Sequence, residues 1–133
     1  MMASENPAEQ PSGRERREFY RITVTLPIRV QRESEPTQRD LVEQSVNLSG
    51  GGLGVTVTDM YQPGEILVVV LHLPDHGLFT AFAEVLRLDP WPSPRGTYRL
   101  HARFIRMTDQ DREVLIRHVT KFQRDHLQDH YLA

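Results

Sequence analysis

Residues 47–57 read Asn-Leu-Ser-Gly-Gly-Gly-Leu-Gly-Val-Thr-Val, and the fold of the surrounding chain follows from this stretch. Four of the eight glycines of the chain lie between positions 50 and 54. Asn, Ser and Gly are typical turn residues, because their side chains bond to nearby backbone or leave it unrestricted. Leu53, Val55 and Val57 then alternate with smaller residues, and a period of two predicts a β-strand. The stretch therefore predicts a tight turn that leads into a strand.

The same alternation recurs on both sides of this stretch. Strands are predicted over residues 20–30, 41–46, 53–57, 66–73, 79–88 and 98–106. Pro27 lacks a backbone N–H, which indicates an edge position or a bulge within the first strand. Pro63-Gly64 is a turn signal between the third and fourth strands. Six short strands at this spacing predict a closed or nearly closed antiparallel β-barrel.

The period changes after Thr108, which is followed by an acidic Asp-Gln-Asp sequence typical of a helix N-terminus. Leu115, Val119 and Phe122 then repeat at helical spacing. We expect an amphipathic helix over about 109–128 that covers one open end or face of the barrel.

The 133 residues fit one domain. We expect a disordered polar tail over 1–13, the domain over 14–129 and a short tail over 130–133. The absence of cysteine excludes disulfides and thiolate metal sites. No apolar run approaches the roughly 20 residues of a membrane span, and no signal peptide is visible, so we expect a cytoplasmic protein without membrane insertion.

Two short groups of residues carry potential binding chemistry. Arg17 and Arg21 are four apart before the first strand, so in an extended chain they lie on one side. Guanidinium groups bind phosphate and the O6/N7 edge of guanine, although such a patch alone is more often a solvated surface. Asn47 and Ser49 add polar groups beside glycines that permit close approach of a ligand. Alone, this second group is more often a simple turn.

Together, the patterns RxxxR and NxSxxG resemble the signature of the PilZ domain family. Arg17 and Arg21 match the first motif, and Asn47, Ser49 and Gly52 match the second. Further segments also resemble the family over about 16–123: residues 53–55, 63–65, 83–87, 102–104 and 108–112.

The resemblance implies a mainly β fold, a six-stranded antiparallel PilZ-like β-barrel with a C-terminal α-helix, and binding of the bacterial second messenger cyclic di-GMP. It implies that the arginines bind guanine edges and phosphates and that the second motif meets a guanine. The candidate ligand-binding residues are Arg16, Arg17, Arg21, Asn47, Ser49 and Gly52. Asn47 stands where the family often has Asp, which keeps an acceptor but removes a charge. We expect Gly52 to leave room for a purine rather than to supply a positive φ.

We therefore predict a receptor without enzyme activity, metal or cofactor. Ligand would order an N-terminal arm and so signal to an effector protein. His126 and His130 lack a third ligand, so a metal site is not expected. Trp91 is expected to cover the barrel mouth rather than to stack on a base.

Two alternatives stay open: a PilZ-like adaptor that binds only protein, and a small barrel that binds single-stranded nucleic acid. The intact motifs argue against the first. The net charge of −2 argues against the second, so we expect no DNA or RNA partner.

Overall fold

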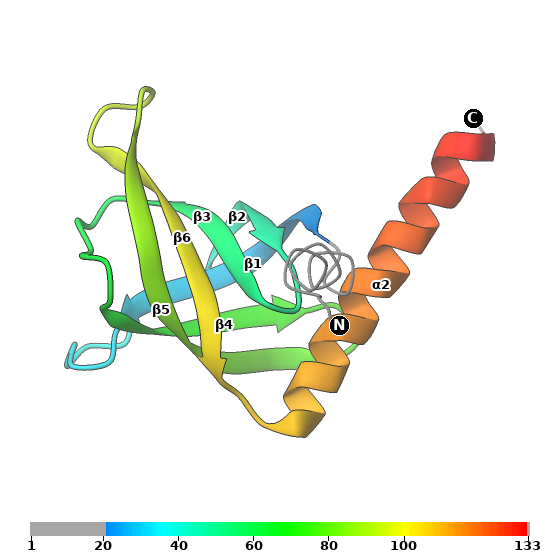
Figure 1. The fold of residues 1–133 in the computed structure, drawn as a ribbon, viewed down its shortest axis with the longest axis horizontal. Coiled ribbons are helices and arrows are strands. Elements are labelled where there is room, and N and C mark those ends of the chain that lie inside the picture. The colour runs from blue at the N-terminus through cyan, green and yellow to red at the C-terminus, as the bar shows by residue number, and fades with distance from the viewer. Residues whose placement is uncertain (1–20, 133) are drawn as a thin grey trace, which may run out of the picture.

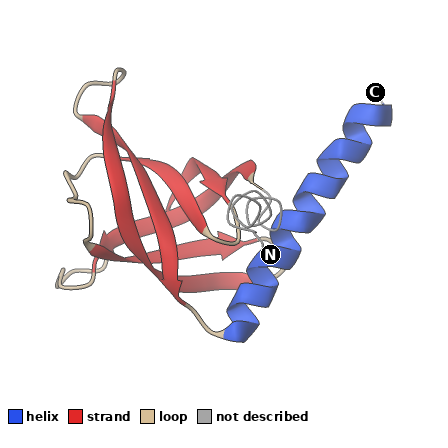
Figure 2. Ribbon diagram, in the orientation of Figure 1, coloured by secondary structure: helices blue, strands red, loops and turns tan. Residues whose placement is uncertain are grey.

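The computed structural model describes residues 21–132, with side chains described up to His126. Figures 1 and 2 show a β-barrel and one long helix. The elements are β1 (Ile22–Arg32), β2 (Val42–Leu48), β3 (Gly52–Val57), β4 (Ile66–Leu73), β5 (Gly77–Trp91), β6 (Thr97–Arg106) and α2 (Asp109–Leu132). The expected tail over 1–13 lies outside the described residues.

The six strands form a closed barrel in the order β1-β2-β3-β6-β5-β4, and every neighbouring pair is antiparallel. This confirms the predicted barrel. Pro27 pairs with Glu43 of β2, while the ladder between β1 and β4 begins only at Ile28. Pro27 therefore has a strand partner on one side only, which suits a residue without a backbone N–H. The register shifts occur instead between β5 and β6.

Side chains that point into the barrel form one hydrophobic core. The rings of Phe79 and Phe104 meet edge to face at 6.3 Å inside it. Thr108 begins the helix as predicted, because its Oγ1 accepts a hydrogen bond from the N–H of Asp111 at 3.0 Å. Leu115 and Val119 are buried against the barrel. The helix ends at Leu132 rather than at about residue 128, and its last turns run past the barrel (Figure 1).

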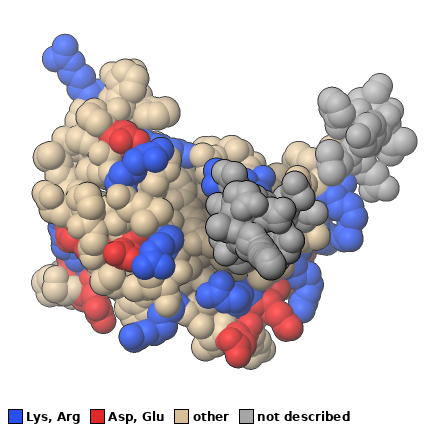
Figure 3. Space-filling view, in the orientation of Figure 1, with Lys and Arg blue, Asp and Glu red and all other residues tan. Residues whose placement is uncertain are grey.

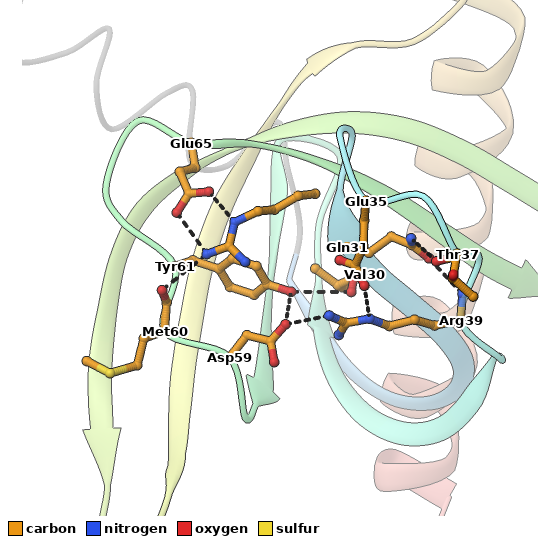
Figure 4. Close-up of polar contacts among 10 residues, drawn as sticks. Val30, Gln31, Glu35, Thr37, Arg39, Asp59, Met60, Tyr61 and Glu65 are labelled. Atoms are coloured by element: carbon orange, nitrogen blue, oxygen red, sulfur yellow. Dashed lines mark hydrogen bonds and ion pairs between the residues drawn. The ribbon is translucent and has the colours of Figure 1, made fainter.

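A cluster of polar contacts, which we call the Arg39 cluster, joins the β1–β2 loop to the segment after β3 (Figure 4). Arg39 contacts both Glu35 and Asp59 at 2.6 Å. The hydroxyl of the buried Tyr61 lies 3.2 Å from the same Asp59 carboxylate. The hydrogen bond from Arg39 holds the pKa of Asp59 below its ordinary value, and burial raises the pKa of Tyr61 to about 12. These contacts fix two loops on one side of the barrel.

A pocket of about 390 Å³ opens beside this cluster, where β2 and β3 separate. The two strands share only two register pairs, at Asn47 and Leu48 of β2. Beyond these pairs the gap is lined partly by Val42 and Val55.

In the part of the chain described, no helix is long and apolar enough to span a membrane.

Candidate functional site

The turn between β2 and β3 is organised by Ser49. Its Oγ accepts hydrogen bonds from the N–H groups of Gly51 at 3.1 Å and Gly52 at 3.2 Å. Its own N–H donates to the carbonyl of Gly52 at 3.0 Å. A serine hydroxyl that bonds to backbone two and three residues ahead stabilises a turn. Ser49 thus has a structural task, and its contact with a ligand stays a prediction.

The expectation that glycine is needed at position 52 to leave room for a purine is wrong. A Cβ at Gly52 would lie 2.3 Å from the carbonyl oxygen of Ala102 and 3.0 Å from the Cα of Arg103. The backbone of Gly52 does not adopt a left-handed φ. The neighbouring strand β6 therefore fills the space that we assigned to a purine. Glycine is required at this position because two backbones approach closely.

A row of outward-facing residues crosses four strands next to this turn. Asn47 of β2 pairs with Gly54 of β3, Gly54 pairs with His101 of β6, and His101 pairs with Arg87 of β5. Asn47, Gly54 and His101 alternate with buried neighbours, so these positions face the outside of the barrel, and Arg87 is exposed next to a register shift in β5. Thr23 extends the row to β1 through a 2.9 Å hydrogen bond from its hydroxyl to Oδ1 of Asn47.

Gly54 has no side chain and is buried beneath the side chains of Asn47 and Arg99. A Cβ there would lie 3.6 Å from Nδ2 of Asn47 and 3.6 Å from Nη2 of Arg99. Arg99 is half-buried, and Nη1 donates to Oγ1 of Thr56 at 3.2 Å. Burial lowers the pKa of Arg99, and among residues 21–126 no carboxylate lies within ion-pair distance of it. Arg99 can therefore offer charge and N–H donors to an anion.

The predicted site residue Arg21 reaches the same surface. It is exposed and directly precedes Ile22, which pairs with Leu48 at the end of β2. The pKa of His101 is lowered by burial first, and then by the positive charges of Arg87, Arg99 and Arg21. Arg21 therefore lies within electrostatic range of the row. Its companions in the first motif, Arg16 and Arg17, lie outside the described residues.

Acidic groups balance only part of this charge. Nε of Arg87 lies 3.0 Å from Asp89, and Nε2 of His101 lies 3.6 Å from the same carboxylate. Arg103 is paired with Glu84. On the face shown in Figure 3, basic side chains are interspersed with acidic ones rather than forming one continuous basic surface. That face is thus not suited to a long polyanion.

Sequence reasoning missed Gly54, Arg99 and His101 as site residues. The sequence signal for their outward position was present, because Arg99, His101 and Arg103 alternate with buried residues along one strand.

The expected position of Trp91 as a cover for the barrel mouth is wrong. Trp91 ends β5 and is 44% exposed, on a β5–β6 hairpin that extends beyond the other strands (Figure 1).

Comparison with protein-family models matches residues 15–121 to the family described as PilZ domain. The chain belongs to the PilZ domain family. No curated protein sequence matches this PilZ domain.

Among solved structures, an inhibitor of motility from Bacillus subtilis (MotI/DgrA) is similar, with a TM-score of 0.66 and 22% identity over 83% of this chain and 52% of that chain. YcgR from Escherichia coli in complex with c-di-GMP is similar with a TM-score of 0.65 and 19% identity, over 86% of this chain and 49% of that chain. A tetrameric PilZ domain from Xanthomonas campestris is similar with a TM-score of 0.68 and 15% identity, over 82% of this chain and 90% of that chain.

The chain thus spans about half the length of the B. subtilis and E. coli proteins. At these identities the likeness concerns the fold.

Proposed function

We propose that this PilZ domain is a cytoplasmic, non-catalytic receptor that binds cyclic di-GMP on the outer surface around Gly54. The observation that carries the proposal is the convergence of Arg21, Asn47 and Arg99 on one surface beside the β2–β3 turn. Two of these residues belong to the RxxxR and NxSxxG motifs. The described similarity to YcgR in complex with c-di-GMP supports the same ligand class.

The chemistry of the surface suits a ligand with two phosphates and two guanines. Arg17 and Arg21 bind the phosphates and the O6/N7 edge of guanine, together with the neighbouring Arg16. Asn47 presents an amide to a guanine, with its Oδ1 already accepting a hydrogen bond from Thr23. Ser49 and Gly52 hold the turn that places Asn47, and Ser49 also contacts the ligand in this proposal.

Signalling follows from ordering of the arm that carries the first motif. The ligand is held between this arm and the barrel, so it favours arrangements in which Arg17 and Arg21 lie against β2 and β3. A ligand shifts an equilibrium only by its difference in affinity between two arrangements, and the arginines supply that difference here. The altered surface is then presented to an effector protein.

Isothermal titration calorimetry with cyclic di-GMP tests this function and yields the stoichiometry. Cyclic di-AMP is the matched control, since it has the same phosphates but lacks the O6 acceptor of guanine. A single-stranded oligonucleotide tests the nucleic-acid alternative. We expect saturable binding of cyclic di-GMP only. Absence of binding to cyclic di-GMP would overturn the proposal.

A further inference from the structure

The β5–β6 hairpin carries an exposed aromatic ring next to a cation. Register pairs continue from Asp89↔Arg99 to Trp91↔Thr97, so Trp91 and Arg99 are diagonal neighbours on the outer surface. Cζ of Arg99 lies 5.9 Å from the centroid of the Trp91 ring. This separation is within the range of a cation–π contact, which holds the ring against the hairpin.

The geometry leaves Trp91 available for a second partner. The residue is 44% exposed, although Trp usually buries most of its surface. The guanidinium of Arg99 contacts one part of the Trp91 ring, and the exposed part of the ring is accessible to a planar group. Purine bases stack on aromatic rings in many nucleotide sites, because every base has a π-face. An exposed indole held by an arginine is therefore suited to a purine.

Arg99 connects this ring to the site already described. Its Nη2 lies 3.6 Å from the Cβ position of Gly54, and Gly54 is paired with Asn47. The row that contains Trp91 is two residues farther along the hairpin than the row of Arg99, which corresponds to about 7 Å. A ligand with two bases joined by phosphates can thus meet Asn47, Arg99 and Trp91 in succession.

We propose that Trp91 and Arg99 form a stacking platform that extends the ligand site along the β5–β6 hairpin. Arg99 binds a phosphate of the ligand, and the exposed surface of the Trp91 indole stacks on a guanine that does not contact Asn47. The inference rests on the proposed function, because it assigns further residues to the same ligand.

Trp91 is the only tryptophan of the chain, so its fluorescence reports on this position alone. We expect titration with cyclic di-GMP to quench the fluorescence, and the quenching to follow the calorimetric binding curve. Trp91→Ala should lower the affinity about fivefold to a hundredfold, as expected for loss of one stacked base. Trp91→Phe should restore most of the affinity, and Arg99→Ala should lower it.

Leu78→Ala is the matched control, because Leu78 is another exposed apolar residue of β5, 62% exposed, at the opposite end of the strand. It should leave the affinity unchanged, and thermal melting checks that each variant folds. Two results would overturn the platform and leave the receptor function intact. One is that Trp91→Ala binds cyclic di-GMP as tightly as the natural protein does. The other is that the natural protein binds cyclic di-GMP without any quenching of the Trp91 fluorescence. No binding by the natural protein would overturn the receptor function itself.

Discussion

Arg99 of β6 covers the buried backbone of Gly54 of β3, with Nη2 3.6 Å from the point that a Cβ of Gly54 would occupy. Asn47 borders the same point from the other neighbouring strand, with Nδ2 also at 3.6 Å. The absence of a side chain at Gly54 thus lets Asn47 and Arg99 approach each other across β3, so that a ligand on this surface can meet both polar groups.

The two strand glycines of β3 should respond differently to alanine. Gly52→Ala places a methyl group 2.3 Å from the carbonyl oxygen of Ala102, so strand β6 must move. We expect the free energy of unfolding to fall by about 1–3 kcal/mol, the usual cost of overpacking. Urea denaturation measures this, and unchanged stability would show that the two strands separate without cost.

Gly54→Ala is the paired change, because its methyl group would meet Asn47 and Arg99 only at ordinary contact distance. We expect near-normal stability and weaker binding of cyclic di-GMP, since the methyl group would lie against Asn47 and Arg99 and restrict how these side chains reach the ligand. Calorimetry beside urea denaturation separates the two effects. Normal affinity in a folded Gly54→Ala protein would show that the ligand does not depend on the arrangement of Asn47 and Arg99 over Gly54.

We expect His101 to make the binding of cyclic di-GMP depend on pH. Its pKa is lowered in the free protein by burial and by the charges of Arg87, Arg99 and Arg21, with Asp89 acting in the opposite direction. An anionic ligand nearby should raise that pKa, so binding should take up a proton and strengthen as the pH falls through the ligand-bound pKa, until it levels off below the free-state pKa, which lies under the ordinary value of about 6.5. The gain is up to about tenfold for each unit by which the ligand raises the pKa.

Calorimetry at several pH values measures this effect, and His101→Gln serves as the control. The variant should bind with little dependence on pH, because it keeps a polar side chain that does not titrate. An identical pH dependence in both proteins would show that another group takes up the proton.

The barrel could be predicted from the sequence because each strand has a clear inward and outward alternation. Leu53, Val55 and Val57, for example, lie on the inward side of β3. The role of Gly52 could not be predicted, because it depends on the carbonyl of Ala102, far away in the sequence. The alternation along β6 marks Arg99 and His101 as outward-facing, but it does not reveal that they lie beside Gly54 and Asn47, which depends on strand pairing far apart in the sequence. Trp91 was misplaced because the sequence does not reveal that β5 continues through 89–91.

The Arg39 cluster should contribute modestly to stability, in a manner that depends on pH. The folded-state pKa of Asp59 is lowered mainly by its hydrogen bond with Arg39, so this contribution is present above the unfolded-state pKa of about 3.9 and is lost as the pH falls through the lower folded-state value. Asp59→Asn should cost about 0.5–1 kcal/mol near neutral pH, as for other partly exposed pairs.

Urea denaturation of both proteins near pH 7 and near pH 3 tests this dependence. The difference in unfolding free energy should shrink at the lower pH. A difference that is equal at both pH values would mean that the Asp59 charge is not its cause.

The arm should change its motion when ligand binds. Residues 14–18 are polar and include no apolar side chain before Phe19 that could anchor them. We expect backbone NMR order parameters of 14–18 below those of the barrel without ligand, and a rise on addition of cyclic di-GMP. Values already equal to those of β1 in the free protein would exclude ordering of the arm as the signal.

The central claim is tested most directly by the affinity of Arg21→Ala for cyclic di-GMP, measured by calorimetry beside the natural protein. Arg21 is exposed, so the variant should fold normally. Loss of charge-assisted hydrogen bonds worth about 1.5–3 kcal/mol predicts a tenfold to hundredfold weaker affinity, and Arg17→Ala should behave similarly. Arg117→Ala, which removes an exposed charge from α2, should bind as the natural protein does. Unchanged affinity in both Arg17→Ala and Arg21→Ala would contradict the account.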